Sequence, residues 1–157
     1  FKDSWLETNE FGDSYIKEEL QGGYHYHFDQ QFLEIFFNTG GKIELYNYSI
    51  KKNDLIISGE MIPPKTIRLV HPHLDNVTSE GVIIHELGHY FDEKHQFSSS
   101  KQFTELYKKY RTLFNQKTKK EYFAECFKEY VGGHQEKVKP FHSYMKTITQ
   151  KIRQKNK

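Results

Sequence analysis

The stretch GVIIHELGHYFD, residues 81–92, constrains the fold more than any other part of the sequence. At about 100° per residue, a helix here would separate polar from apolar side chains. The polar side, an arc of roughly 120°, holds His85, Glu86, His89 and Asp92. The apolar side holds Ile83, Ile84, Leu87, Tyr90 and Phe91. One side of this helix must therefore enter a hydrophobic core, while the other needs polar partners from elsewhere in the chain.

The His-Glu-x-x-His spacing within this stretch suits a metal ion. Neutral imidazoles at i and i+4 project in parallel from one helix and can share a tetrahedral metal. Glu86 would then lie beside the metal, where it can take a proton from activated water and pass it to a leaving amine. Because the short motif recurs by chance and two histidines do not complete a zinc site, a third ligand must come from the rest of the chain.

His95 is one candidate for the third ligand. HELGHYFDEKH compares with the metzincin pattern HExxHxxGxxH, but Asp92 occupies the glycine position. That glycine ends the helix in a turn that swings the last histidine back to the metal, and aspartate adopts such a turn less readily. We therefore expect His95 to lie near the end of the helix as a solvated residue.

The second candidate lies in KKEYFAECFKEYV, residues 119–131. On a helical wheel Glu121, Glu125 and Glu129 share one side, opposite an apolar side. A solvated acidic stripe is the simplest interpretation, but like charges at i, i+4 cost stability unless a cation lies nearby. A gluzincin-type site uses such a pair: the first carboxylate binds zinc, and the second accepts the free N–H of a ligating histidine.

Together, GVIIHELGHYFD and EYFAECF resemble the catalytic core of the anthrax lethal factor family, small gluzincins that include the clostridial Pro-Pro endopeptidases. The resemblance covers residues 79–131. It implies one zinc ion bound by His85, His89 and Glu121. It also implies that Glu86 is the general base and acid, and that Glu125 and Asp92 contact the ligands rather than the ion.

The sequence departs from this family at Phe114. Family members place a tyrosine that stabilises the oxyanion seven residues before the ligand glutamate, and here that position is Phe114. Tyr110, one turn earlier on the same face of an expected helix, is the candidate to supply the hydroxyl. If no hydroxyl reaches the site, we expect slower turnover or a different electrophile rather than loss of zinc.

The order of local patterns predicts an α+β fold with a small mixed sheet. The chain of 157 residues, with 13 Phe and 11 Tyr, can bury one core and is too short for two ordinary domains. We predict a single zinc metallopeptidase domain over 1–157, with helices and a small sheet in 1–75 and a helical, zinc-binding half in 76–157.

Expected helices cover Ser14–Leu20 and Phe32–Phe37, the second capped by Asp29. Expected strands are KIELYNYSI, DLIIS and TIRLV; Ser98–Ser100 and Thr118 open later helices.

Charge and cysteine content narrow the function further. The net charge is +2, but residues 137–157 carry seven basic residues and no acid, which invites a nucleic-acid interpretation. An apolar series at helical spacing in this tail favours a final helix docked on the body: Phe141, Met145, Ile148 and Ile152. The single cysteine, Cys126, excludes an internal disulfide and a cysteine-built zinc knuckle. We expect no nucleic-acid partner and no membrane span.

The expected function is a monomeric zinc-dependent endopeptidase that hydrolyses protein or peptide substrates. An extended substrate would pair with an exposed strand edge, either TIRLV or KIELYNYSI. The resemblance implies an exported, toxin-like bacterial protein, although FKDSWLETNE at the start contains no signal peptide. The alternative is a weak or inactive zinc-containing domain that binds a partner. Intact Glu86 argues against that alternative, and the absent tyrosine argues for it.

Overall fold

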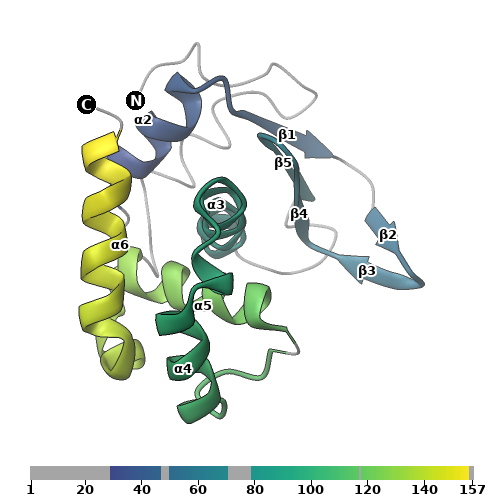
Figure 1. The fold of residues 1–157 in the computed structure, drawn as a ribbon. Helices are drawn as coiled ribbons and strands as arrows, with labels where there is room; N and C mark the ends of the chain where they lie inside the picture. The colour runs from purple at the N-terminus through teal and green to yellow at the C-terminus, as the bar shows by residue number, and fades with distance from the viewer. Residues whose placement is uncertain (1–28, 47–49, 71–78, 117, 156–157) are drawn as a thin grey trace.

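The computed structural model of the protein describes residues 29–46, 50–70, 79–116 and 118–155. Strands cluster in the first half of these ranges and helices fill the second, so the predicted α+β class is confirmed (Figure 1). The elements are α2 (Gln30–Asn38), β1 (Lys42–Tyr46), β2 (Ile50–Lys52), β3 (Leu55–Ile57), β4 (Gly59–Ile62), β5 (Thr66–Val70), α3 (Ser79–His95), the 3-10 helix η3 (Phe97–Ser99), α4 (Lys101–Lys109), α5 (Lys119–Val131), the 3-10 helix η4 (Gln135–Phe141) and α6 (His142–Lys155). The expected helix at Ser14–Leu20 lies outside the described residues.

The first described helix, α2, forms as its capping pattern predicts. The Asp29 side chain accepts a hydrogen bond from the Gln31 N–H at 3.0 Å. At the other end Gly40 takes φ 90°, and the Gly41 N–H donates to the Phe36 carbonyl. The apolar face of α2 is buried, with the Phe32 ring 5.9 Å from Phe91 and 5.6 Å from Phe127. This helix thus closes the core over α3 and α5.

The main sheet has three strands in the order β1-β5-β4. β1 pairs with β5 in parallel, from Lys42↔Thr66 to Tyr46↔Val70, whereas β4 pairs with β5 antiparallel. The sheet is therefore mixed, as predicted. Because β5 is paired on both sides, the expectation that TIRLV offers an open edge is wrong; among the described residues, the strands at the edges are β1 and β4.

A separate hairpin of β2 and β3 projects beside the main sheet (Figure 1). Asn53 and Asp54 form its two-residue turn, both with positive φ, which matches the right-handed twist of the two strands. The expected strand KIELYNYSI is therefore divided, since its start forms β1 and Ile50 begins β2.

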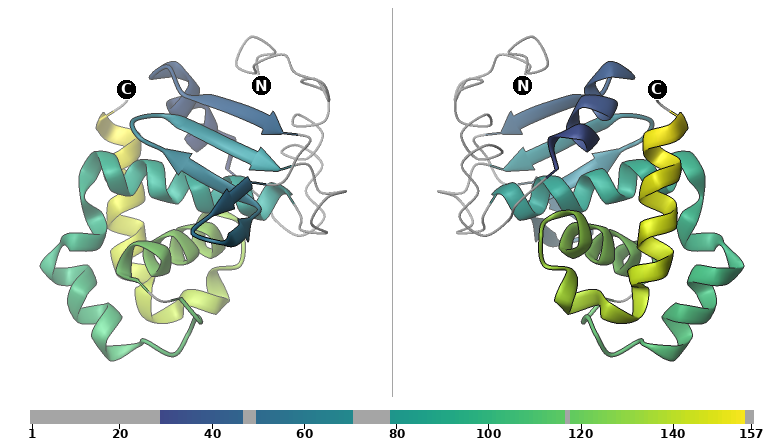
Figure 2. Two further views of the ribbon diagram at one scale, coloured as in Figure 1. Left: turned by 90° about the vertical axis from the view of Figure 1, so that its right-hand side faces the viewer. Right: turned by 90° about the vertical axis from the view of Figure 1, so that its left-hand side faces the viewer.

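The helical half is built around α3. Figure 2 shows α3 running beneath the three-stranded sheet, with α5 on its other side. Buried apolar side chains of α3 fill both contacts: Ile83, Ile84, Leu87 and Phe91. The expected docking of the C-terminal helix is confirmed, because Phe141, Met145, Ile148 and Ile152 are all buried. None of the helices in the described ranges has both the length and the apolar character needed to cross a membrane.

Gly88 sets the distance between α3 and α5. A Cβ atom at this position would lie 3.0 Å from the Cα of Ala124 and 3.2 Å from the Cβ of Phe127. The missing side chain lets the two helices approach closely at this point. His85 and His89 flank Gly88 in sequence, so the close approach also brings their side of α3 against the acidic side of α5.

Candidate metal centre

Three side chains with metal-ligand chemistry converge from α3 and α5. His85 Nε2 lies 2.9 Å from Glu121 Oε2, and His89 Nε2 lies 3.0 Å from Glu121 Oε1. One donor atom from each of the three residues lies within 4.8 Å of the other two. The carboxylate of Glu121 is thus held between two imidazoles, and this His-His-Glu group could hold a metal ion.

The start of α5 positions Glu121. The Thr118 side chain caps the helix by accepting a hydrogen bond from the Glu121 N–H at 3.2 Å. Glu121 thereby occupies the first turn, where the helix dipole favours a negative charge. The sequence TKKE is enough to explain why this carboxylate is presented at the helix N-terminus.

Glu125, one turn later on α5, lies behind His85. Its Oε1 atom is 2.8 Å from His85 Nδ1, and its Oε2 atom is 2.8 Å from Lys128 Nζ. The two ring nitrogens of His85 therefore face two different carboxylates. A carboxylate on Nδ1 fixes the ring orientation and leaves Nε2 directed at the ligand group.

These contacts shift the pKa values of the cluster. Burial lowers the pKa of His85, but Glu121 and Glu125 outweigh it and raise the pKa to about 9. Hydrogen bonds from His85 and His89 hold the pKa of Glu121 well below its usual range. Burial raises the pKa of Glu125, but His85 and Lys128 reverse the effect and lower it. His85 on one side and Glu121 and Glu125 on the other therefore favour each other's charged forms.

Glu86 is the remaining carboxylate next to the histidines. Its residue is only 7% exposed, yet it lines a cavity of about 440 Å³ together with His89 and Glu121. Burial raises the pKa of Glu86, while His85 and His89 oppose that shift. A buried carboxyl group with a raised pKa at a cavity wall can both accept and return a proton.

The opposite wall of this cavity comes from the end of β3 and from β4, with Ile57, Gly59, Glu60 and Met61. β4 was not among the expected strands, and so Glu60 was not among the expected site residues. Lys120 also lines the cavity, next to the candidate ligand Glu121. Its position beside Glu121 in the sequence was the one signal that could have indicated it.

Asp92 lines the cavity, but its side chain accepts a hydrogen bond from the backbone rather than contacting a ligand histidine. Its Oδ1 atom accepts from the Ser98 N–H at 2.7 Å, and the residue is 4% exposed. This contact anchors the chain that follows α3. Asp92 therefore holds the segment that follows the helix. Its hydrogen bond to Ser98 does not involve either imidazole.

His95 is not brought to the cluster. α3 continues to His95 without a turn at Asp92, and the chain turns only at Gln96, which has φ 59°. The expected position at the end of the helix is confirmed, but the side chain is not fully solvated, because the His95 ring is half-buried and stacks on Phe97 at 5.0 Å.

Tyr110 is not brought to the cavity either. α4 ends at Lys109, and the Tyr110 ring packs against Phe141 at 6.1 Å. Its carbonyl accepts a hydrogen bond from the Tyr122 hydroxyl, while Phe114 packs on the ring of Tyr122 at 5.4 Å. Neither Tyr110 nor Phe114 lines the cavity, and no tyrosine of the described residues does. The structure therefore does not place Tyr110 at this cavity, and its role as the oxyanion-stabilising hydroxyl stays a prediction.

The fold and site define a small α+β domain in which two adjacent helices bring together a His-His-Glu group. No protein-family model and no curated protein sequence matches this chain.

Proposed function

We propose that the protein is a zinc-dependent endopeptidase of the gluzincin type, similar to the anthrax lethal factor family. One observation carries this proposal: the buried carboxyl of Glu86 lines the same cavity as His89 and Glu121. Two imidazole nitrogens and one carboxylate oxygen are a donor set typical of catalytic zinc, whereas calcium and magnesium prefer oxygen ligands. The chemistry of the donors therefore favours zinc.

In this proposal, His85, His89 and Glu121 hold the ion. Bound zinc supplies a Lewis acid that polarises a carbonyl group and lowers the pKa of water. Glu86 accepts a proton from the attacking water and returns it to the leaving amine, a task for which its raised pKa is suited. Glu125 keeps the His85 ring oriented through Nδ1.

Edge strand β4 is the proposed docking element for an extended substrate. β4 pairs with β5 on one side and, within the described residues, with no strand on the other. A Cβ atom at Gly59 would lie 3.9 Å from Glu86 Cγ, so β4 begins directly over the proposed base. A peptide paired with this edge would pass along the cavity wall. β4 is therefore proposed in place of TIRLV, while β1, at the start of KIELYNYSI, is the other edge strand and does not line the cavity.

The substitution Glu86→Gln tests the proposed function. The amide keeps the shape of the side chain but cannot take a proton, so we expect unchanged zinc content and a fall in peptide cleavage of at least about 100-fold. Cleavage of a peptide library, with and without a chelator, is the measurement. Glu93→Gln, on the same helix and at the same cavity but exposed, is the matched control. Undiminished cleavage by the Glu86 variant would falsify the assigned mechanism.

A second candidate function is a zinc-containing domain that binds a partner without cutting it. The position of Tyr110, packed on Phe141 away from the cavity, favours this alternative. The same peptide-library screen of the wild-type protein separates the two. Chelator-sensitive cleavage supports the enzyme, and zinc binding without any cleavage supports the binding domain.

A further inference from the structure

The acidic side of α5 continues beyond Glu125 to Glu129, a carboxylate that the proposed mechanism does not use. The Glu129 side chain is only 6% exposed and is surrounded by basic side chains. His134 Nδ1 lies 2.9 Å from its Oε2 atom, and Lys137 Nζ lies 3.8 Å from the same atom. A carboxylate this buried needs such partners, because an unpaired buried charge is costly.

Lys128 joins this buried carboxylate to the candidate metal centre. Its Nζ atom lies 2.8 Å from Glu125 Oε2 and 3.6 Å from Glu129 Oε1. The Lys128 side chain is 17% exposed, so its ammonium group is held between two carboxylates rather than in open solvent. Without this cation, two like charges one helical turn apart would repel each other on α5.

The position of the ammonium group determines what Glu125 can do. One Glu125 oxygen is occupied by Lys128, which leaves the other facing His85 Nδ1 at 2.8 Å. Both oxygens are therefore engaged, which opposes rotation of the carboxylate. His85 Nδ1 thus faces Glu125 at ion-pair distance, with Nε2 directed at the ligand group.

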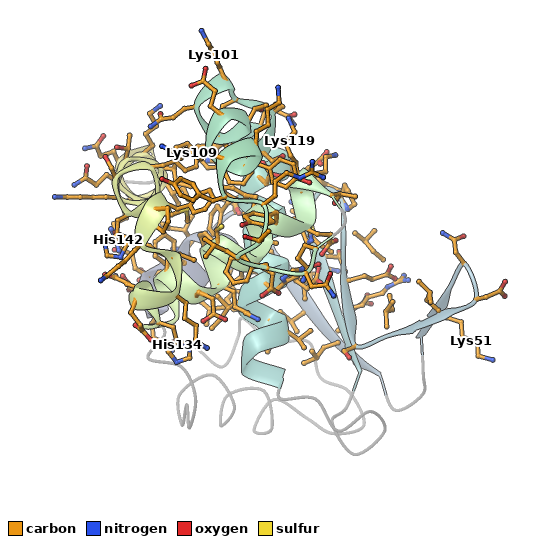
Figure 3. All side chains as sticks on the ribbon, turned by 90° about the horizontal axis from the view of Figure 1, so that it is seen from below. Lys51, Lys101, Lys109, Lys119, His134 and His142 are labelled. Carbon is orange, nitrogen blue, oxygen red and sulfur yellow. The ribbon has the colours of Figure 1, made fainter. Side chains whose placement is uncertain are left out.

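The turn after α5 fixes the far end of this arrangement. Gly133 takes φ 90°, and the His134 N–H donates to the Glu129 carbonyl at 2.8 Å. The chain thereby folds back so that the His134 ring meets the Glu129 carboxylate. In Figure 3, the labels Lys119 and His134 mark the regions of the two ends of α5. These contacts begin at His85 on α3, continue along α5 through Glu125 and Lys128, and end at the turn that follows α5.

We propose that Lys128, held in place by Glu129, is a positioning residue of the metal centre: it fixes Glu125 and, through Glu125, the imidazole of His85. This inference rests on the metal site of the proposed function, and it adds a residue that touches neither the ion nor the cavity. Surface ion pairs contribute little, but these carboxylates are largely buried, so loss of the cation changes the ligand geometry.

Three variants test the inference. Lys128→Met removes the charge and keeps the length of the side chain, Lys128→Arg keeps a cation, and Lys137→Met is the matched control. Lys137 also contacts Glu129, but its side chain is 56% exposed and it makes no described contact with Glu125. Affinities for Zn²⁺ and Co²⁺ are measured by competition with a chelator. The visible spectrum of bound Co²⁺ and the low-field proton resonance of His85 Nδ1–H report the ligand geometry.

We expect Lys128→Met to weaken metal binding by about 10- to 100-fold, to change the Co²⁺ spectrum and to lose the Nδ1–H resonance. Lys128→Arg should retain the affinity, the Co²⁺ spectrum and the resonance, and Lys137→Met should change none of them. If Lys128→Met keeps the wild-type affinity and the wild-type Co²⁺ spectrum, the positioning role of Lys128 is overturned, but the proposed metal centre is not. If Lys128→Met does not fold, Lys128→Gln, which keeps a neutral donor, takes its place. A wild-type protein that binds neither ion would overturn the metal centre and this inference with it.

Discussion

His85 is the residue whose surroundings are most unusual. Its Nε2 and Nδ1 atoms each lie within 3 Å of a carboxylate oxygen, at 2.9 Å from Glu121 and 2.8 Å from Glu125. Those two acceptors outweigh burial, so the pKa of His85 rises from 6.5 to about 9. The pKa of Glu121 is displaced the other way, well below its usual 4.5, by its hydrogen bonds to His85 and His89.

These shifts predict how the stability of the metal-free protein depends on pH. The raised pKa of His85 contributes stability that is fully present below pH 6.5 and is lost as the pH rises through about 9. The lowered pKa of Glu121 contributes stability that is present above pH 4.5 and is lost as the pH falls further. We therefore expect the free energy of unfolding to decline by up to about 3 kcal/mol between pH 6.5 and 9. Urea unfolding at a series of pH values measures it.

The variant His85→Asn is the control for this pH dependence. It removes the imidazole that faces both carboxylates and leaves the other histidines in place. Its unfolding free energy should be nearly flat between pH 6.5 and 9. A decline as steep as that of the wild-type protein would show that another group causes it.

At the residue scale, the sequence predicted which side chains form the cluster, but it did not predict the position of every candidate residue. Two helical wheels were enough to put His85, His89 and Glu121 on facing sides, and the structure brings these three together. Tyr110 depended on a helix that continued to Phe114, and α4 ends at Lys109. Just after the end of that helix, the Tyr110 carbonyl accepts a tertiary hydrogen bond from the Tyr122 hydroxyl, a contact that local patterns cannot reveal.

Among the elements, the first turn of α5 links helix stability to the candidate site. Thr118 caps the turn that carries Glu121, and its replacement by alanine leaves the Glu121 N–H without its side-chain acceptor. We expect Thr118→Ala to cost about 1 kcal/mol of stability. Because the first turn then frays, metal affinity should fall up to about fivefold, the ratio that 1 kcal/mol represents. Chemical unfolding and chelator competition measure the two effects.

Ser100→Ala provides the matched control. Ser100 caps α4 by the same chemistry, accepting from the Phe103 N–H at 3.2 Å, but α4 carries none of the three candidate ligands. This variant should lose a similar amount of stability and keep its metal affinity. Equal losses of affinity in both variants would mean that global destabilisation, not the turn at Glu121, is responsible.

The elements that the sequence predicted are those with a local signal. Caps at Asp29, Ser100 and Thr118 occur where the sequence indicated helix starts. β4 had no such signal, because Gly59 is typical of the boundary of a strand. Its four residues are all half-buried in the structure, so it also lacks the alternation of a strand with one buried face. Pairing with β5 makes GEMI a strand, and that contact is tertiary.

For the whole molecule, the candidate metal centre joins segments that are distant in the sequence. His85 and Glu121 are 36 positions apart, on two helices that approach at Gly88. An ion bound to both helices stabilises only the folded state. At a free Zn²⁺ concentration of 100 times its Kd, the gain is about 2.7 kcal/mol, and the Tm should rise by about 5 to 10 °C.

Calorimetry with and without a chelator measures this shift. Glu121→Ala removes one ligand of the group and should abolish the rise in Tm. His95→Ala should retain it, because His95 stacks on Phe97 and lies outside the group. The reverse pattern, with the rise kept by the first variant and lost by the second, would restore His95 as a ligand.

The arrangement of the whole chain was predictable only in outline. The order of helices and strands gave the α+β class, since each periodic run reports its own element. The order β1-β5-β4 was not predictable, because the parallel pairing of β1 with β5 joins strands that are separated by the β2–β3 hairpin and β4.

The carboxylate of Glu121 lies between two imidazoles, and its contact with His85 raises the pKa of that imidazole, so a proton on His85 can balance the charge of the carboxylate. Loading the site is then an exchange reaction, in which a divalent ion enters and the imidazole proton leaves to the buffer. The measured enthalpy of metal binding would then include the ionisation enthalpy of the buffer, and a low pH would favour release of the ion. Such a protein would retain its metal in neutral surroundings and release it where protons are abundant.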